Sequence, residues 1–311
     1  MIIAQVAGVI LVSSVGRSAQ VVVTPVEVIP GGIARVVVSG ACEGAEGSVG
    51  GQALRFFRTG DEGHMVALSG IDVDAPEGAR EVEVRCNGWQ ERASFRVRAH
   101  EFPRQELTVP DRYVRPSPAE GARAAEEARR LSRLWATTSP ERLWHGKFQR
   151  PAEGPLGAQF GLQRILNGEP RSPHSGIDIS ASHGTPVVAA NRGRVALRDG
   201  LFFSGNTIVL DHGLGLYTAY LHLSEFRAFE GEVVAKGQTI GLVGATGRAT
   251  GPHLHFGARL GGARVEPWQL ITADLDIAAA SRYGADGGPE GATGANAGEN
   301  ERTEESSVRG E

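Results

Sequence analysis

Short valine-rich runs that end in glycine turns recur along this chain, and they restrict its fold more than any other feature. Residues 35–39 and 81–86 are two such runs, and in the second Val82, Val84 and Cys86 alternate with charged neighbours. An alternation of period two is typical of a strand that buries one face. The 43 glycines supply tight turns between runs of this kind. We therefore expect a mainly β protein with little helix.

The charge and hydropathy of the chain argue against two kinds of partner. Its formal net charge is −4, so it lacks the basic field that non-specific binding to nucleic acid requires. Beyond the N-terminus, no apolar run reaches the roughly 18 residues that a membrane helix needs. We therefore expect neither a nucleic-acid partner nor a membrane span.

The N-terminus is apolar and uncharged over residues 1–15, and the small residues Gly16, Ser18 and Ala19 follow. This order is typical of the hydrophobic region and cleavage site of a secretory signal peptide. We predict a signal peptide at residues 1–19 and an exported protein of the periplasm or cell envelope. The alternative is that the segment forms a first strand of the core.

Cys42 and Cys86 are the only two cysteines, and neither belongs to a C-x-x-C pair of the kind that binds zinc or does redox chemistry. In an exported protein, one disulfide between them is the expected state. Two buried free thiols are the alternative for a protein that is not exported.

Changes in composition divide the chain into segments. The N-terminal half has turn signals at intervals typical of a β-sandwich, and the last residues have too few apolar side chains to form a core. The predicted segments are the signal peptide at 1–19, an immunoglobulin-like β-sandwich domain at 20–114, a helical linker at 115–145, a second β domain that holds the chemistry at 146–272, and a disordered tail at 273–311.

The helical linker begins with a capping box. Ser117 can cap the helix, Pro118 takes its first position, and Glu120 completes the box. Apolar residues then recur at helical spacing, and charged residues fill the other face, which we expect to be solvated. The sequence leaves open whether this linker is a hinge or a rigid strut. The apolar positions are Ala124, Ala128, Leu131 and Trp135.

Five side chains in the second β domain follow a metal-site pattern: His174, Asp178, His222, His253 and His255. Residues two apart in a strand point to the same face, so His253 and His255 both project into one cleft. A catalytic zinc site uses three nitrogen or oxygen ligands and keeps one position open, and two histidines with one aspartate meet that need. Two histidines are then left to transfer protons or to stabilise an oxyanion.

The residues around this pattern closely resemble the lysostaphin/LytM-type zinc metallopeptidases. The matching strings include RSPHSGIDI at 171–179, YLH at 220–222 and TGRATGPHLHF at 246–256, and the resemblance covers essentially all of residues 148–268. It implies an antiparallel β-sheet domain with a groove. The implied substrate is the stem peptide or cross-bridge of peptidoglycan. The resemblance does not indicate which bond is cleaved.

The resemblance also implies a role for each of the five side chains. His174, Asp178 and His255 are the implied ligands of one zinc ion, while His222 and His253 are the implied catalytic pair that does not bind the metal. His212 also matches a family position, but we expect it at a strand end or turn without a catalytic role.

Three functions are compatible with these features. The leading hypothesis is a zinc metalloendopeptidase that hydrolyses peptidoglycan peptides through metal-activated water. The alternative is a non-catalytic LytM-type scaffold that binds cell wall or activates another hydrolase, although such scaffolds typically lose some of the five side chains. A structural or adhesion protein would explain the first β domain only. The sequence leaves open whether the protein has a regulatory partner in the cell envelope, and it leaves the oligomeric state open. It also leaves open whether the first domain inhibits the enzyme or recruits a partner.

Overall fold

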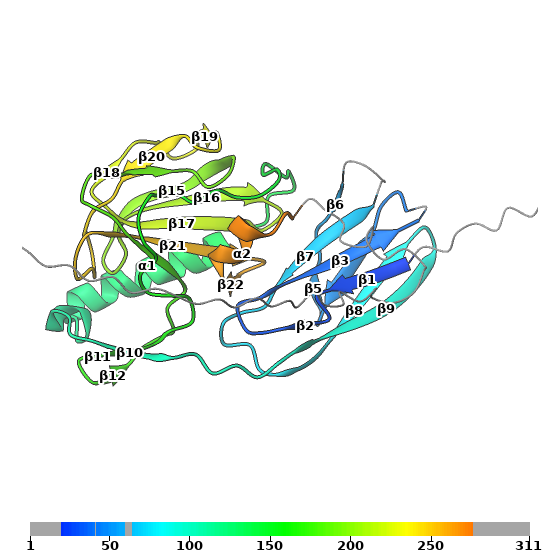
Figure 1. Ribbon diagram of the computed structural model, residues 1–311, viewed down its shortest axis with the longest axis horizontal. Helices are drawn as coiled ribbons and strands as arrows, with labels where there is room; N and C mark the ends of the chain where they lie inside the picture. Colours follow the sequence, from blue (N-terminus) through cyan, green and yellow to red (C-terminus); the bar gives the residue numbers. More distant parts are fainter. Residues whose placement is uncertain (1–19, 41, 60–63, 276–311) are drawn as a thin grey trace, which may run out of the picture. The chain divides into compact units, whose positions relative to one another are not determined.

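The computed structural model describes residues 20–40, 42–59 and 64–275 (Figure 1). The predicted signal peptide, and the part of the predicted tail from 276 onward, lie outside the described residues. The expectation of a mainly β protein is confirmed, since the described part has many strands and only two α-helices, α1 (Pro118–Ala136) and α2 (Pro267–Thr272). Among the described residues, neither helix combines the length and the apolar character needed to cross a membrane.

Two sheets pack face to face in the N-terminal β region, which we define as residues 20–97. In sheet order, the first consists of β1 (Gln20–Thr24), β3 (Ile33–Ser39), β7 (Met65–Gly70) and β6 (Phe56–Arg58), and the second of β2 (Glu27–Val28), β9 (Trp89–Val97), β8 (Gly78–Cys86), β4 (Glu46–Val49) and β5 (Gln52–Ala53). The two sheets share a core that contains Val36, Val38, Val82 and Val84. The valine-rich runs of the sequence lie within β3 and β8, as expected.

A disulfide joins Cys42 to Cys86, with their Cα atoms 5.8 Å apart. Cys86 ends β8, and the turn at Asn87 and Gly88 then leads directly into β9. Both turn residues have positive φ, 46° and 84°, which asparagine and glycine adopt more readily than other residues. The predicted disulfide is confirmed.

The first of these sheets is buried on both faces. Val36 and Val38 of β3 enter the core between the two sheets, whereas Val37 between them enters a second core that extends into the rest of the protein. In that second core, the ring of Phe57 meets the ring of Trp144 edge to face, with centroids 5.2 Å apart. The consecutive valines therefore form a strand that is covered on both sides.

An antiparallel sheet of seven strands organises the C-terminal β region, residues 146–275. Its order is β13 (Gly176–Ser180), β21 (His253–Leu260), β17 (Leu216–Leu223), β16 (Gly205–Gly213), β15 (Gly193–Leu201) and β19 (Val233–Val234), with β22 (Ala263–Val265) also paired to β21. One face buries Ile179, Tyr220, Leu254 and Phe256, all fully covered. The opposite face carries α1 and the site described below.

Two small sheets complete the fold. One consists of β14 (Pro186–Val188), β20 (Thr239–Leu242) and β18 (Glu225–Phe226). In the other, β10 (Arg104–Leu107) pairs in parallel with β11 (Gln163–Leu166), which continues into β12 (Glu169–Pro170). The connecting segment, residues 98–145, thus contributes a strand to a hairpin of the C-terminal β region.

Helix α1 begins with the predicted capping box, in which Ser117 and Glu120 exchange hydrogen bonds. Three of its apolar side chains, Leu131, Leu134 and Trp135, pack against the seven-stranded sheet. The ring of Trp135 meets that of Tyr217 edge to face, at a centroid distance of 5.5 Å. The helix therefore covers part of the sheet.

The charged face of α1 is largely exposed, as expected, and three of its side chains also bond to the C-terminal β region. Arg123 donates to the carbonyl oxygen of Gly200 at 2.6 Å, and Arg130 pairs with Asp199 at 2.5 Å. Glu127 accepts a hydrogen bond from the backbone N–H of Phe202. The end of β15 lies beside the helix and offers these partners, so these contacts connect the helix to the seven-stranded sheet.

Candidate metal centre

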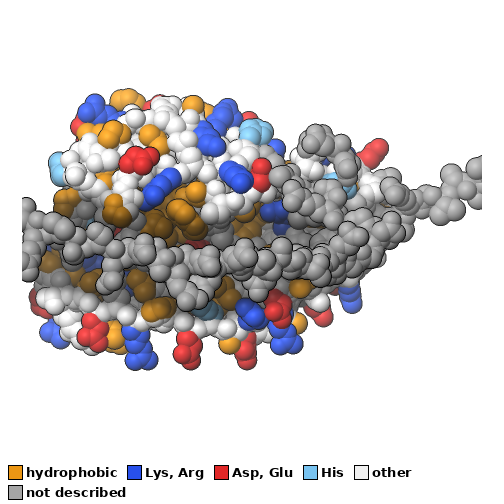
Figure 2. Space-filling view, in the orientation of Figure 1, with side chains coloured by type: hydrophobic (Ala, Val, Ile, Leu, Met, Phe, Trp, Pro, Cys, Tyr) orange, Lys and Arg blue, Asp and Glu red, His pale blue; other side chains and the backbone are white. Residues whose placement is uncertain are grey.

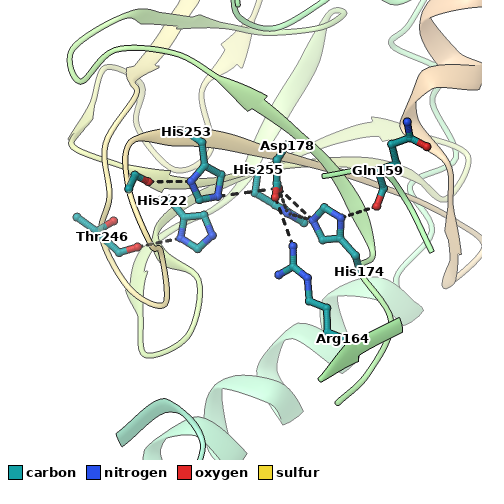
Figure 3. A network of polar contacts seen from close by, with 9 residues as sticks. Gln159, Arg164, His174, Asp178, His222, Thr246, His253 and His255 are labelled. Carbon is teal, nitrogen blue, oxygen red and sulfur yellow. Dashed lines mark hydrogen bonds and ion pairs between the residues drawn. The ribbon is translucent and has the colours of Figure 1, made fainter. Parts of the chain in front are cut away.

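Three of the side chains singled out in the sequence converge near one edge of the seven-stranded sheet (Figure 3). Asp178 on β13 and His255 on β21 are direct partners in the antiparallel register, and His174 lies two residues before β13. The atoms Nε2 of His174, Oδ1 of Asp178 and Nδ1 of His255 are 2.8–3.0 Å from one another. Ile177 and Ile179 are buried, so strand alternation places the carboxylate of Asp178 on the other face, as expected.

The donor set fits a metal ion. Nδ1 of His174 lies 2.7 Å from the carbonyl oxygen of Gln159, which can only accept, so Nδ1 carries the proton and Nε2 presents a lone pair. Burial lowers the pKa of His255 to about 4, so this imidazole is neutral near pH 7. Two imidazoles and a carboxylate directed at one point form a set of nitrogen and oxygen ligands that is consistent with zinc.

The remaining two histidines of the pattern stand beside these three. The ring centroids of His222 and His253 are 4.9 Å apart, and that of His222 is 6.2 Å from His255. Nε2 of His253 lies 3.9 Å from Oδ1 of Asp178. Leu254, between His253 and His255, is fully buried on the opposite face. The prediction that His253 and His255 share one face is confirmed.

Backbone carbonyls orient both of these imidazoles. Nδ1 of His222 bonds to the carbonyl oxygen of Thr246, and Nδ1 of His253 to that of Gly251, each at 2.8 Å. Each Nδ1 therefore carries a proton, and in the neutral ring Nε2 is then the proton acceptor. Burial, followed by the nearby charges of His255 and His253, lowers the pKa of His222 to about 3, so it is neutral near pH 7.

The backbone around His222 is unusual. His222 has φ +64°, a left-handed conformation that is rare for residues other than glycine and is often found at functional sites. Its carbonyl partner Thr246 is held in turn, because Oγ1 of Thr246 accepts from the N–H of Asn206 and donates to the carbonyl of Leu223, both at 2.9 Å. Gly205 makes this possible, since a Cβ there would lie only 2.3 Å from Oγ1 of Thr246.

His212 stands apart from this group. It is fully buried, with its ring nitrogens 2.8 Å from the carbonyl oxygen of Arg192 and 2.7 Å from Oγ1 of Thr218. Burial lowers its pKa to about 4. Its partners are satisfied within the protein and its place is near the end of β16, which agrees with the non-catalytic interpretation.

Arg164 was not among the residues predicted for the site, and its Nη2 lies 3.3 Å from Oδ2 of Asp178, the oxygen that faces away from the imidazoles. Arg164 lies on β11, and no pattern in the sequence links it to Asp178. The carbonyl groups of Gln159, Thr246 and Gly251 could not be predicted either. Every residue has a backbone carbonyl, so the sequence does not show which of them contact a side chain.

Two cavities adjoin the centre. One, of about 290 Å³, is lined by Asp178, His222 and His253 among others, and by Gln105 of the connecting segment. The second, of about 130 Å³, reaches His255 and is bounded by residues of α1. The connecting segment therefore borders the open space on both sides of the five side chains.

Comparisons with known proteins place this geometry in a family. Residues 172–267 match the model of peptidase family M23. The chain is 42% identical over 120 residues to the DD-carboxypeptidase/endopeptidase Mpg of Neisseria meningitidis, which covers 36% of this chain and 28% of that protein. It is 41% identical over 106 residues to the peptidoglycan DD-endopeptidase ShyB of Vibrio cholerae, covering 34% and 24%. The matched part thus spans about a quarter of these curated relatives.

A solved structure matches over a greater length. A crystal structure of a Pseudomonas aeruginosa protein assigned to peptidase M23 has a TM-score of 0.64 and 31% identity, and the alignment covers 78% of this chain and 94% of that one. The likeness thus extends well beyond the segment that carries the metal centre. Together with the match to the family model, it shows that this chain belongs to peptidase family M23.

Proposed function

We propose that this protein is a zinc metalloendopeptidase that hydrolyses peptide bonds in the stem peptides or cross-bridges of peptidoglycan. The observation that carries the proposal is the convergence of His174, Asp178 and His255, with His222 and His253 beside them, on one face of one sheet. The names of the Neisseria and Vibrio relatives support the choice of substrate. The family supports peptide hydrolysis.

His174, Asp178 and His255 would hold the zinc ion. When bound, zinc supplies a Lewis acid that polarises the scissile carbonyl and activates water. The carbonyl of Gln159 keeps Nε2 of His174 unprotonated and directed at the site, and it fixes the orientation of the ring. Arg164 engages the second oxygen of Asp178, which leaves Oδ1 directed at the two imidazoles.

His222 and His253 would move protons during hydrolysis. In the neutral form of each ring, Nε2 is the acceptor, because a carbonyl oxygen holds the proton on Nδ1. One Nε2 can therefore accept a proton from the attacking water, and the protonated ring can pass it to the departing amine. A protonated ring can also donate to the tetrahedral oxyanion.

We propose that the protein works outside the cytoplasmic membrane, in the periplasm or cell envelope. The disulfide between Cys42 and Cys86 supports this location, because structural disulfides persist mainly in oxidising compartments. The substrate lies in the same compartment. The predicted signal peptide is part of this proposal.

The experiment is digestion of purified peptidoglycan by the full chain, followed by mass spectrometry of the released fragments. We expect new amino and carboxyl termini at one kind of peptide bond. A chelator should stop the reaction and added zinc should restore it. The scaffold alternative predicts zinc binding without fragments, so absence of cleavage by zinc-loaded protein would decide for the scaffold.

A further inference from the structure

The larger cavity beside the metal centre collects positive charge. Its charged lining residues are Arg164, Arg248 and Asp178, and Asp178 already faces two imidazoles through Oδ1. On the face of the molecule in Figure 2, by contrast, basic and acidic side chains are interspersed. We call this space the arginine cavity. Its two guanidinium groups outnumber the one carboxylate, which the metal centre also uses.

The guanidinium of Arg248 meets no acceptor among the described residues. Within the part of the chain that the structure describes, its side chain makes neither a hydrogen bond nor an ion pair. It makes a cation–π contact with the ring of Phe203, whose centroid is 5.0 Å from the guanidinium carbon. Stacking on an aromatic ring holds a guanidinium in place while its N–H edge stays free. The half-buried Arg248 is therefore a positioned donor without a partner.

Arg164 and Gln105 also keep unused polar atoms at this place. One Nη of Arg164 reaches Asp178, but its Nε is buried with no partner. Oε1 of Gln105, the register partner of Arg164 on the neighbouring strand, is likewise buried without one, and rotation of this amide by half a turn would present an N–H there. Buried polar groups normally have partners, so these atoms point to a ligand that the cavity takes up.

The charges around Arg248 favour an anion as that ligand. Burial, and then the positive charges of Arg164 and Arg171, lower the pKa of Arg248. Arg171 is itself engaged, with Nη2 at 2.6 Å from Glu169 and 2.8 Å from the carbonyl oxygen of Val114. Arg164 and Arg248 therefore have the two guanidinium groups that are available to bind a ligand in the arginine cavity.

We propose that Arg164 and Arg248 form a subsite for a carboxylate of the peptide substrate, next to the scissile bond. A carboxylate matches the planar fork of a guanidinium and gives short, charge-assisted hydrogen bonds. His222 and His253 line the same cavity, which places this carboxylate close to the bond that is cut. The inference rests on the proposed function, and it adds that the enzyme selects peptides with a free carboxylate at that place.

The carboxylate can belong to the end of the peptide or to a side chain, and paired substrates separate these sources. One pair has a C-terminal acid or amide on the residue after the scissile bond, and the other has a side-chain acid or amide beside it. Equilibrium binding of each peptide is measured by calorimetry on metal-free full-length protein, and kcat and KM are measured on the zinc enzyme. In one of the two pairs, we expect the acid to bind about tenfold or more tightly than the amide.

Arg248→Gln tests the assignment. We expect it to remove the preference for acid over amide, whereas Arg248→Lys should keep part of it, since the charge remains and the fork is lost. The control is Arg227→Gln, which makes the same change of charge at an exposed residue paired with Glu225 and outside the cavity. Thermal unfolding checks that each variant is folded.

Two outcomes would overturn the subsite. One is equal binding of acid and amide in both pairs by the unsubstituted protein, and the other is an acid preference that survives in folded Arg248→Gln protein. Cleavage without discrimination would refute the subsite and leave the proposed function standing. Discrimination in binding without cleavage of any peptide would support the subsite and refute the proposed function.

Discussion

At the scale of single residues, backbone carbonyls define the chemistry of three imidazoles. The carbonyls of Gln159, Thr246 and Gly251 each occupy one ring nitrogen, so the other nitrogen of each ring is a proton-free acceptor. At His174 that acceptor lies within 3.0 Å of Asp178 and His255, whereas at His253 the nearest carboxylate oxygen, of Asp178, is 3.9 Å away. The same kind of carbonyl contact thus orients the ring that we propose as a metal ligand and the two rings that we propose as proton carriers.

We expect His255→Ala to lose bound zinc, because it removes one of the three proposed ligands, His174, Asp178 and His255. Zinc per chain, measured by atomic emission after dialysis, should fall from about one to near zero. His183→Ala is the matched control, since His183 is exposed in a turn, and it should retain the metal. Full zinc occupancy in folded His255→Ala protein would contradict the ligand assignment.

His222→Ala and His253→Ala should keep zinc and lose most of the activity. Groups that transfer protons or stabilise an oxyanion typically contribute about 10²-fold or more. The readout is zinc content beside kcat for each variant. Near-normal turnover with full zinc would show that neither ring takes part in the reaction.

The residues of the site could be predicted from the sequence where spacing carries the information. His253 and His255 are two apart in one strand, so alternation alone places them together. Arg164 and Arg248 could not be predicted, because they reach the site from a hairpin and a loop whose positions depend on packing. The left-handed backbone of His222 has no sequence signal, since such strain is maintained by its surroundings.

At the scale of elements, α1 lies on the sheet face that carries the metal centre. The cavity between α1 and His255 has a volume of about 130 Å³, which is below the roughly 300–1,000 Å³ of ordinary ligand pockets. The other cavity is bordered by Gln105 and Leu107 of β10. A peptide that extends across the centre in both directions would therefore meet the connecting segment.

We expect loosening of α1 to raise activity. The double variant Arg123→Ala, Arg130→Ala removes two contacts between the helix and the end of β15. Each such contact contributes up to about 1 kcal/mol, so the rate on a short peptide should rise about threefold to tenfold if access is limiting. The measurement is kcat/KM on that peptide.

The matched control is Arg129→Ala, Arg133→Ala. It makes the same change of charge on the same helix, but in the described part of the chain these residues pair only with the exposed Glu126. The control should behave as the unsubstituted protein does. Equal or lower rates in the Arg123, Arg130 variant would show that α1 does not restrict the substrate.

Helix α1 also shows what the sequence could and could not reveal about elements. Its start was predictable from Ser117, Pro118 and Glu120, because a capping box is a local pattern. Its position on the sheet was not, since the partners of Arg123 and Arg130 lie about 70 residues or more along the chain. The parallel pairing of β10 with β11 is likewise a contact between distant segments.

At the scale of the whole molecule, charged contacts join the N-terminal and C-terminal β regions. Arg264 bonds to Asp72 at 2.5 Å and to Asp74 at 2.6 Å, and its backbone N–H also donates to Asp72. Burial opposes ionisation of Asp72, but its bonds with Arg264 outweigh this, so the pKa of the carboxyl lies below its usual value. The carboxylate form therefore stabilises the folded state.

The pH dependence follows from the direction of that shift. Because the pKa is lower in the folded protein, the stabilisation is complete above the unfolded value of about 3.9 and is lost as the pH falls through the folded value. We expect Asp72→Asn to lower the unfolding midpoint by about 2–4 °C at pH 7, corresponding to about 1 kcal/mol after allowance for solvent screening. The difference should shrink below pH 4, and a difference that is constant with pH would contradict this.

The shared core that contains Val37, Phe57 and Trp144 has a consequence for proteolysis. In a protein built of separately folded units, one cut in the connection releases an independent enzyme. Here a cut between β9 and α1 breaks the chain but leaves apolar side chains of both pieces interlocked. The nicked protein should migrate as one particle in native conditions and as two fragments in denaturant, with or without reduction, because Cys42 and Cys86 lie in the same fragment. Release of a free peptidase would first require disruption of the folded core.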